Sequence, residues 1–183
     1  MSLLFAAVLG CAAIASWLMA AEAKVYARRN LRFACLLYAA LSVAGFIASS
    51  DTSDRAQLVL IVGLLISAMG PPLLAFAAYA TLRRPPSSTL AAGALFLTCV
   101  TGVATVMTGF AVLVLAPQLV AIIALFVVAL RSSRSMAWRL GLSALALLAG
   151  SLSVVADSRE AGLMFMLFSA AGLLGVSRAL ARA

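Results

Sequence analysis

The sequence contains no histidine, and only 10% of its 183 residues are charged. Without histidine the chain cannot form a His-ligated haem or metal site, or a triad of serine, histidine and acid. Its three cysteines, Cys11, Cys35 and Cys99, fall in three different apolar segments with no C-x-x-C pair. That placement is typical of small buried side chains rather than of redox or metal groups. We therefore expect no cofactor, no metal centre and no enzymatic activity.

Two further absences narrow the function. The single lysine, Lys24, lies between apolar segments, so it cannot form a retinal Schiff base inside a helix bundle. No acidic residue lies at membrane depth, so the carboxylate relay of a proton-driven or sodium-driven pump has no candidate. Both classes of membrane protein are excluded.

Apolar residues are abundant instead. They make up 66% of the chain, whereas a soluble domain is about half apolar. They form uncharged blocks of roughly 18 to 27 residues, and about 20 residues cross a hydrocarbon core of about 30 Å. The alternating pattern of a membrane β-barrel is absent. The fold class is therefore an all-α polytopic transmembrane helical bundle, with residues 1–183 as one integral membrane domain.

Charged positions divide the chain into seven predicted spans. The uncharged block from Pro85 to Leu130 is 46 residues long, about 69 Å as a helix, so it must cross the bilayer twice. We place its turn near Met107 to Phe110, where Thr108-Gly109 is the best local helix breaker. The predicted spans are about 3–21, 33–50, 57–82, 88–107, 111–130, 138–156 and 162–177.

Basic residues gather in alternate loops, as the positive-inside rule expects for seven spans. Eleven of the 13 fall on one side, whereas Arg55 and Arg159 share the opposite loops with acids. We predict an outside N-terminus and a cytoplasmic C-terminus. Because this topology accounts for the net charge of +8, no nucleic-acid partner is expected. The eleven basic residues are Lys24, Arg28, Arg29, Arg32, Arg83, Arg84, Arg131, Arg134, Arg139, Arg178 and Arg182.

The first span also admits a signal-peptide interpretation, because LMAAEAK follows an apolar stretch. However, Met1-Ser2 carries no positive side chain, and cleavage would leave the most basic segment as a free tail. We therefore expect span one to remain in a multi-pass protein of the cell membrane, specifically the bacterial cytoplasmic membrane. The lipid bilayer is its first partner, and other membrane subunits or further copies of the chain are candidate partners.

Two segments of the chain follow the same pattern. RFACLLYAALSVAGFIASSDTSDRAQL and RLGLSALALLAGSLSVVADSREAGL each run from an arginine through a span to an outer acidic pair and into the next span. The first three spans would then correspond to the last three, with span four as a linker. This pattern suggests a parallel 3+1+3 repeat.

The acidic pairs, Asp51 with Asp54 and Asp157 with Glu160, admit two interpretations. Their spacing suits a cation or a magnesium–diphosphate site. A capping residue followed three positions later by an acid, just before an apolar run, is also the pattern of a helix capping box. We favour capping.

Gly70, Pro71 and Pro72 interrupt the third span close to the bilayer midplane. Each proline lacks a backbone donor, so the carbonyls of Ser67 and Ala68 lose their usual partners. One interpretation is a broken helix whose second half begins at Pro71 and points its N-terminus at a binding site. The other is a packing kink shielded by neighbouring helices, which membrane proteins tolerate.

Further polar side chains occur in the fourth and fifth spans. Thr98, Thr101 and Thr105 share one helical face with Thr108, and they could line a polar path or bond back to their own helix. Gln118, after Pro117, is the most polar side chain predicted within the hydrocarbon. This Pro-Gln pair resembles that of the PQ-loop and SWEET-like sugar carriers, which share the outside N-terminus and the 3+1+3 layout. The corresponding place in span one, Gly10-Cys11, has no proline, so that family's paired hinge is missing.

Two functions fit these features. The first is a facilitative carrier or channel for a small uncharged solute, with Gly70, Pro71, Pro72, Thr98, Thr101, Thr105 and Gln118 as candidate substrate-binding residues. The second is a non-catalytic scaffolding or regulatory subunit of a larger membrane complex. A water-lined cavity that reaches Pro71 and Thr101 would favour the carrier, and a dry bundle with a flat apolar face would favour the subunit.

Overall fold

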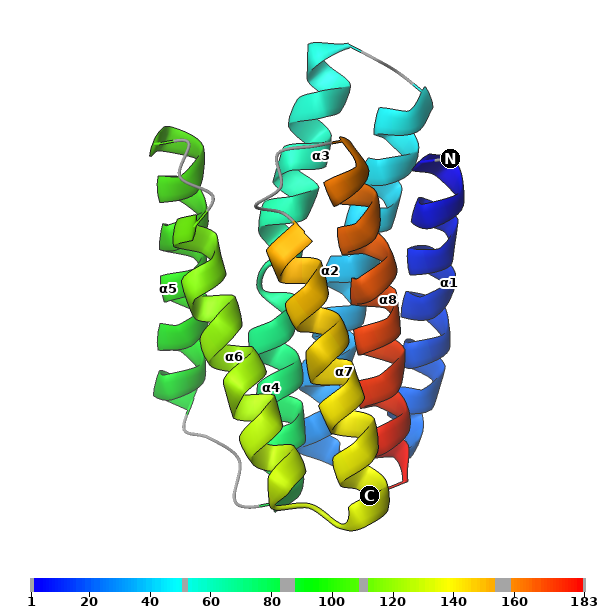
Figure 1. The fold of residues 1–183 in the computed structure, drawn as a ribbon, viewed down its shortest axis with the longest axis vertical. Coiled ribbons are helices and arrows are strands. Elements are labelled where there is room, and N and C mark those ends of the chain that lie inside the picture. The colour runs from blue at the N-terminus through cyan, green and yellow to red at the C-terminus, as the bar shows by residue number, and fades with distance from the viewer. Residues whose placement is uncertain (1, 51–52, 83–87, 109–111, 154–158, 183) are drawn as a thin grey trace.

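The protein is helical throughout the parts of the chain described by the computed structural model, which are residues 2–50, 53–82, 88–108, 112–153, 159–182. Figure 1 shows long helices that run side by side, with the N-terminus and the C-terminus at opposite ends of the bundle. The elements are α1 (Ser2–Met19), the 3-10 helix η1 (Ala20–Glu22), α2 (Val25–Ser50), α3 (Asp54–Ser67), α4 (Gly70–Leu82), α5 (Ser88–Thr108), α6 (Val112–Leu130), α7 (Arg134–Ser153) and α8 (Arg159–Ala181).

The helices confirm the predicted membrane bundle. Within the described ranges, six helical stretches are long and apolar enough to cross a membrane, with α3 and α4 counted together. The apolar stretch Leu115–Leu130 of α6 lies at the remaining predicted span. The predicted turn also fits, because α5 ends at Thr108 and α6 begins at Val112. Gly109 and Phe110 lie outside the described residues.

Several helices are longer than the predicted spans. α2 begins at Val25 although its span was predicted from residue 33, and α7 begins at Arg134 rather than near 138. Charged residues mark where hydrocarbon ends, but they do not end a helix, because arginine has a high helix propensity. The Arg28 side chain donates to the Ala23 carbonyl from Nε at 3.3 Å and from Nη2 at 3.1 Å, just before α2 begins.

The start of α3 corrects the predicted capping box. Ser53 is the N-cap, since its side chain accepts a hydrogen bond from the Ala56 amide at 3.4 Å. Asp54 occupies the first helical turn, where a carboxylate suits the positive helix end. Asp51 and the side chains of Asp157 and Glu160 lie outside the described residues. The cap is therefore the serine between the two acids.

Helix packing repeats in the two halves of the chain. α2 packs between α1 and the α3–α4 pair, and α7 packs between α6 and α8. The halves join mainly where α1 contacts α8 and where α4 contacts α6, and α8 also makes smaller contacts with α2 and α4. These contacts form a closed ring of six spans, and α5 lies outside it along α6 (Figure 1). This is the neighbour pattern expected of the predicted 3+1+3 arrangement.

Small residues bring the ring helices close together. The hydroxyl of Ser42 on α2 donates to the Ala6 carbonyl of α1 at 2.6 Å, directly beside Gly10. A Cβ on Gly172 of α8 would lie 2.6 Å from Cγ of Leu147 on α7, so only glycine fits there. Close backbone approach of this kind is how membrane helices gain packing energy without a hydrophobic driving force between them.

The ends of α1 and α2 next to η1 carry basic and aromatic side chains. The Arg32 guanidinium lies 5.1 Å from the ring centroid of Trp17, a cation–π contact between α2 and α1. Tyr26 is exposed in the first turn of α2, and Trp138 is exposed one turn into α7. An interfacial belt of aromatic and basic residues is expected at the level of the lipid headgroups.

Candidate functional site

The third span is broken into two helices. α3 ends at Ser67, α4 begins at Gly70, and the two residues between them form a turn. The chain tightens there, because the Met69 amide donates to the Ile66 carbonyl at 3.2 Å, one residue closer than in an α-helix. The break therefore precedes the predicted junction by two residues, and both prolines occupy the first turn of α4.

The break separates a peripheral half from a buried half. α3 has only three buried residues in the described structure, and its side chains include exposed Leu58 and Ile61. Residues 70–75 of α4 are all buried. Proline is tolerated in a first helical turn because the amides of that turn have no intrahelical acceptor. The two prolines are thus accommodated at the start of α4, where the buried half of the span begins.

Gly70 is required by a close contact with Tyr38 of α2. A Cβ on Gly70 would lie 2.5 Å from Cζ and from the hydroxyl oxygen of Tyr38. Tyr38 is fully buried, and its hydroxyl, which lies toward Ser169 of α8, has no hydrogen-bond partner among the described residues. The N-terminus of α4 is therefore packed against an aromatic ring on this side.

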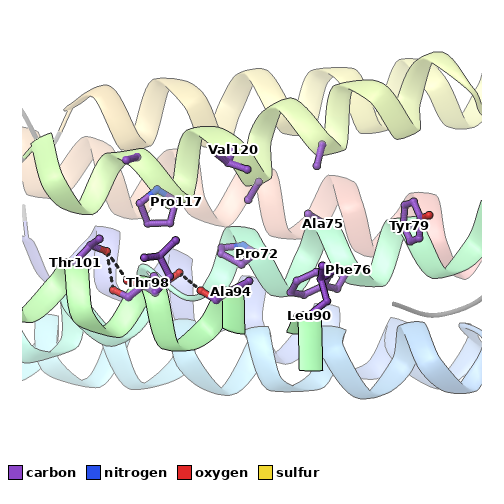
Figure 2. A pocket seen from close by; sticks show the side chains of 14 residues that line it. Pro72, Ala75, Phe76, Tyr79, Leu90, Ala94, Thr98, Thr101, Pro117 and Val120 are labelled. Carbon is purple, nitrogen blue, oxygen red and sulfur yellow. Dashed lines mark hydrogen bonds between the residues drawn. The ribbon is translucent and has the colours of Figure 1, made fainter. Parts of the chain in front are cut away.

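A cavity of about 730 Å³ lies on the other side of α4, between α4, α5 and α6. Figure 2 shows its lining, which includes Pro72 of α4, Pro117 of α6, and Thr98 and Thr101 of α5. The remaining wall is almost entirely apolar and includes Phe76. Lining residues are Pro72, Ala75, Phe76, Tyr79, Leu90, Ala94, Leu97, Thr98, Thr101, Ala116, Pro117, Val120, Ala121 and Ala124.

The threonine hydroxyls donate within α5. Thr98 Oγ1 donates to the Ala94 carbonyl at 2.8 Å, and Thr101 Oγ1 lies 3.0 Å from the carbonyls of both Leu97 and Thr98 (Figure 2). Thr105 follows the same pattern, because its Oγ1 donates to the Thr101 carbonyl at 2.8 Å. Each hydroxyl oxygen keeps acceptor lone pairs after donating its proton. Thr98 and Thr101 can therefore accept hydrogen bonds in the cavity without supplying charge.

The predicted site residues divide into three groups. Pro72, Thr98 and Thr101 come together in the cavity wall, whereas Thr105 lies outside it. Gly70 and Pro71 are buried at the start of α4 without lining the cavity. Gln118 is buried beside the wall, 3% exposed, and its Oε1 has no partner among the described residues.

Sequence reasoning missed Tyr38 and the apolar wall. Tyr38 carries a polar group at mid-span, a signal that could have been noticed. Leu90, Ala94 and Ala121 carry no such signal, because in a membrane helix they are indistinguishable from lipid-facing residues. Their role follows only from which helices are neighbours.

The site offers shape and apolar surface rather than catalytic groups. Among the residues that the structure describes, no charged side chain lines the cavity. Among the described residues no cluster of three or more potential metal ligands occurs. A charged ligand would lose its hydration without compensation here, so the chemistry suits an uncharged ligand.

Comparisons with protein-family models, with curated proteins and with solved structures find no match to this chain.

Proposed function

We propose that this integral membrane protein is a facilitative carrier of a small uncharged solute that has an apolar body and one or two hydroxyl groups. The observation that carries the proposal is the α4–α5–α6 cavity, whose volume of about 730 Å³ falls within the range of about 300–1,000 Å³ typical of ligand sites. It reaches Thr101 and Pro72 but not Pro71, and its wall is apolar, so it meets the sequence-based expectation of a water-lined site only in part. Its apolar wall would hold the body of the solute. Thr98 and Thr101 would accept hydrogen bonds from its hydroxyl groups.

The cavity lies where the backbone of two helices is weakened. Both prolines line it: Pro117 removes one hydrogen bond to the preceding turn of α6, and Pro72 stands in the first turn of α4, directly after the break in the third span. Discontinuous and proline-bearing helices near the midplane are the usual pivots of membrane carriers. Movement of α4 and α6 about these points would expose the cavity to one side of the membrane and then to the other.

The test is to fill the cavity with one side chain. Ala94→Phe places an aromatic ring in the cavity wall, whereas Ala92→Phe, two residues earlier on an exposed face of α5, serves as the matched control. Purified variants in lipid vesicles are challenged with propanediol, butanediol and cyclohexanediol, with glycerol and a hexose as more polar comparison solutes, and uptake is followed by stopped-flow light scattering. We expect at least one solute to enter faster than in empty vesicles, and Ala94→Phe alone to slow it about tenfold.

A structural readout accompanies the flux measurement. Xenon occupies apolar cavities, so crystals under xenon pressure should show it between Pro72 and Pro117 in the original protein and not in Ala94→Phe. If no tested solute crosses faster than in empty vesicles, or if both phenylalanine variants transport equally, the carrier proposal is wrong for this class of solutes.

The second candidate function is a non-catalytic subunit of a larger membrane complex. The peripheral position of α5 favours it, because only 11% of the span Thr89–Thr108 is buried within the chain. Native electrophoresis of membranes in mild detergent tests it. A complex much larger than one 18.8 kDa chain that is lost in Val103→Trp, an exposed position of α5, would support this function.

A further inference from the structure

A second hollow lies between α6 and α7, near the turn that joins them. It has a volume of about 550 Å³ and is formed by one face of α7 against Phe126 of α6. From Arg134 at the first residue of α7, it continues past Trp138 and Gly141 to Leu145. The spacing of i, i+4, i+7 and i+11 keeps these four residues on one helical face. We name this hollow the α6–α7 groove.

The groove has the length of one membrane leaflet. Eleven residues separate Arg134 from Leu145, which is about 16 Å along a helix, and half of a hydrocarbon core is about 15 Å. Arg134 stands at the end that we predict to be cytoplasmic, where headgroups lie. Leu145 consequently lies close to the midplane, where acyl chains end.

The chemistry of the groove changes along its length as a phospholipid does. Arg134 is exposed at the mouth, and its guanidinium can pair with a phosphate through two parallel hydrogen bonds. Trp138, 70% exposed, follows one turn deeper, at the level where an indole meets the polar–apolar boundary. Below them the wall is apolar and includes Leu142 and Leu145.

Gly141 leaves room for a chain at the centre of the groove. A Cβ built on Gly141 would meet no atom within 4 Å, whereas one on Gly172 would clash with Leu147 of α7. Gly172 is thus used for helix packing and Gly141 is not. The missing side chain opens the groove instead.

The charge around the mouth selects the headgroup. Arg131 and Arg139 flank Arg134 in sequence, and Glu22 is the single acid on the predicted cytoplasmic side. Basic residues close to the membrane surface attract anionic lipids, and of these three arginines Arg134 lines the groove itself. We propose that the α6–α7 groove is a binding site for an anionic phospholipid of the cytoplasmic leaflet, with its phosphate on Arg134, its glycerol beside Trp138 and one acyl chain over Gly141.

The native tryptophans allow a direct test. The chain has two, so Trp17→Phe leaves Trp138 as the sole fluorophore and keeps an aromatic ring beneath Arg32. The purified protein is placed in phosphatidylcholine vesicles that contain a small fraction of either phosphatidylglycerol or phosphatidylcholine with brominated acyl chains. We expect brominated phosphatidylglycerol to quench Trp138 with about fivefold higher apparent affinity.

Three variants separate the parts of the site. Arg134→Gln should abolish the fivefold preference for phosphatidylglycerol over phosphatidylcholine. The control is Arg29→Gln, which changes an exposed basic residue at the same end and should leave the preference unchanged. Gly141→Leu should weaken quenching by both lipids, because it fills the space for the chain. Circular dichroism checks that each variant keeps its helices, and Gly141→Leu still tests the site if Arg134→Gln does not fold.

Two outcomes would overturn the proposal. One is that the two brominated lipids quench Trp138 equally in the protein with Arg134 intact. The other is that soluble glycerol phosphate, which has the anionic phosphate without the chains, abolishes the preference at low millimolar concentration. The ligand would then be a free phosphate rather than a lipid.

Discussion

At the scale of single residues, the contact between Gly70 and Tyr38 is the tightest constraint on the helix break. The ring of Tyr38 occupies the place where any side chain on residue 70 would begin. Because Tyr38 is buried among several helices, it has little room to move. The position of α4 therefore depends on the absence of a single methyl group.

Gly70→Ala should destabilise the protein by about 1–3 kcal/mol, because an added methyl group forces the ring and the backbone apart. The free energy of unfolding in mixed detergent measures this. Gly93→Ala is the control, since a Cβ at Gly93 would meet nothing within 4 Å. Equal stability of Gly70→Ala and Gly93→Ala would contradict the contact.

A double variant separates a local clash from a general backbone effect. In the background of Tyr38→Ala the ring is gone, so Gly70→Ala should cost much less there than it does alone. We expect the two changes to be non-additive by about 1 kcal/mol or more. If the stability losses of the two changes are additive, the contact with the ring is not the reason for the glycine, and Gly70 is instead needed for the conformation of the backbone.

Hydroxyl groups at different residues should contribute differently to stability. Ser42 bonds across two helices, whereas Thr105 bonds within its own helix. Ser42→Ala should cost about 0.6–1.7 kcal/mol, the range measured for hydrogen bonds between membrane helices, and Thr105→Val should cost little. Unfolding measurements on both variants check this, and a larger loss for Thr105→Val would assign α5 a tighter attachment than its contacts indicate.

At the scale of elements, the division of the third span into α3 and α4 has the largest consequences. The sequence predicts an interruption at Gly70-Pro71-Pro72, because the missing donors follow from composition alone. It cannot decide between a kink and two helices, since that depends on what surrounds the turn. Here the structure has two helices, with the prolines in the first turn of α4 and the ring of Tyr38 against Gly70.

Replacing both prolines should separate stability from transport. Pro71→Ala with Pro72→Ala restores two backbone donors, so stability should stay unchanged or rise. Solute uptake in vesicles should fall, because a continuous helix would no longer pivot beside the cavity. Unchanged uptake of every solute that the original protein transports would remove the helix break from the proposed mechanism.

The cavity shows the limit of sequence reasoning at this scale. Pro72, Thr98 and Thr101 could be chosen in advance because each is unusual in a membrane helix. Their meeting with Ala94 and Ala121 could not, because it depends on α5 packing along α6. The same apolar residue types occur at lipid-facing and at cavity-facing positions of a membrane helix. Only the packing of the helices therefore distinguishes the two kinds of position.

At the scale of the whole molecule, the prediction of an all-α membrane bundle is confirmed, and within the described residues six of the seven predicted spans are helices long and apolar enough to cross a membrane, with the shorter apolar stretch Leu115–Leu130 at the seventh. Hydrophobic length and the placement of arginine carry this information strongly, because both reflect the dimensions of the bilayer. The ends of the helices were predicted less well, as α2 and α7 extend past the hydrocarbon into the charged segments.

The predicted orientation of the protein in the membrane can be tested directly by cysteine labelling. A single cysteine at Ser133, in the turn between α6 and α7, should resist a membrane-impermeant maleimide in intact cells and react in inverted vesicles. A cysteine at Ser53, at the opposite end, should show the reverse. Both are placed in a chain whose native cysteines are alanine. If Ser133→Cys is labelled in intact cells, the predicted orientation is wrong and the turn between α6 and α7 lies outside the cell.

The position of α5 outside the ring bears on how the two halves of the chain are connected. Every contact that closes the ring joins α1–α4 to α6–α8, and α5 contributes none of them. In the predicted topology, the crossing of α5 returns the chain to the leaflet where it began, so the second half would insert in the same sense as the first. Under the predicted 3+1+3 repeat, two three-span halves would close the ring by pairing with each other, and α5 would serve as the bridge between them.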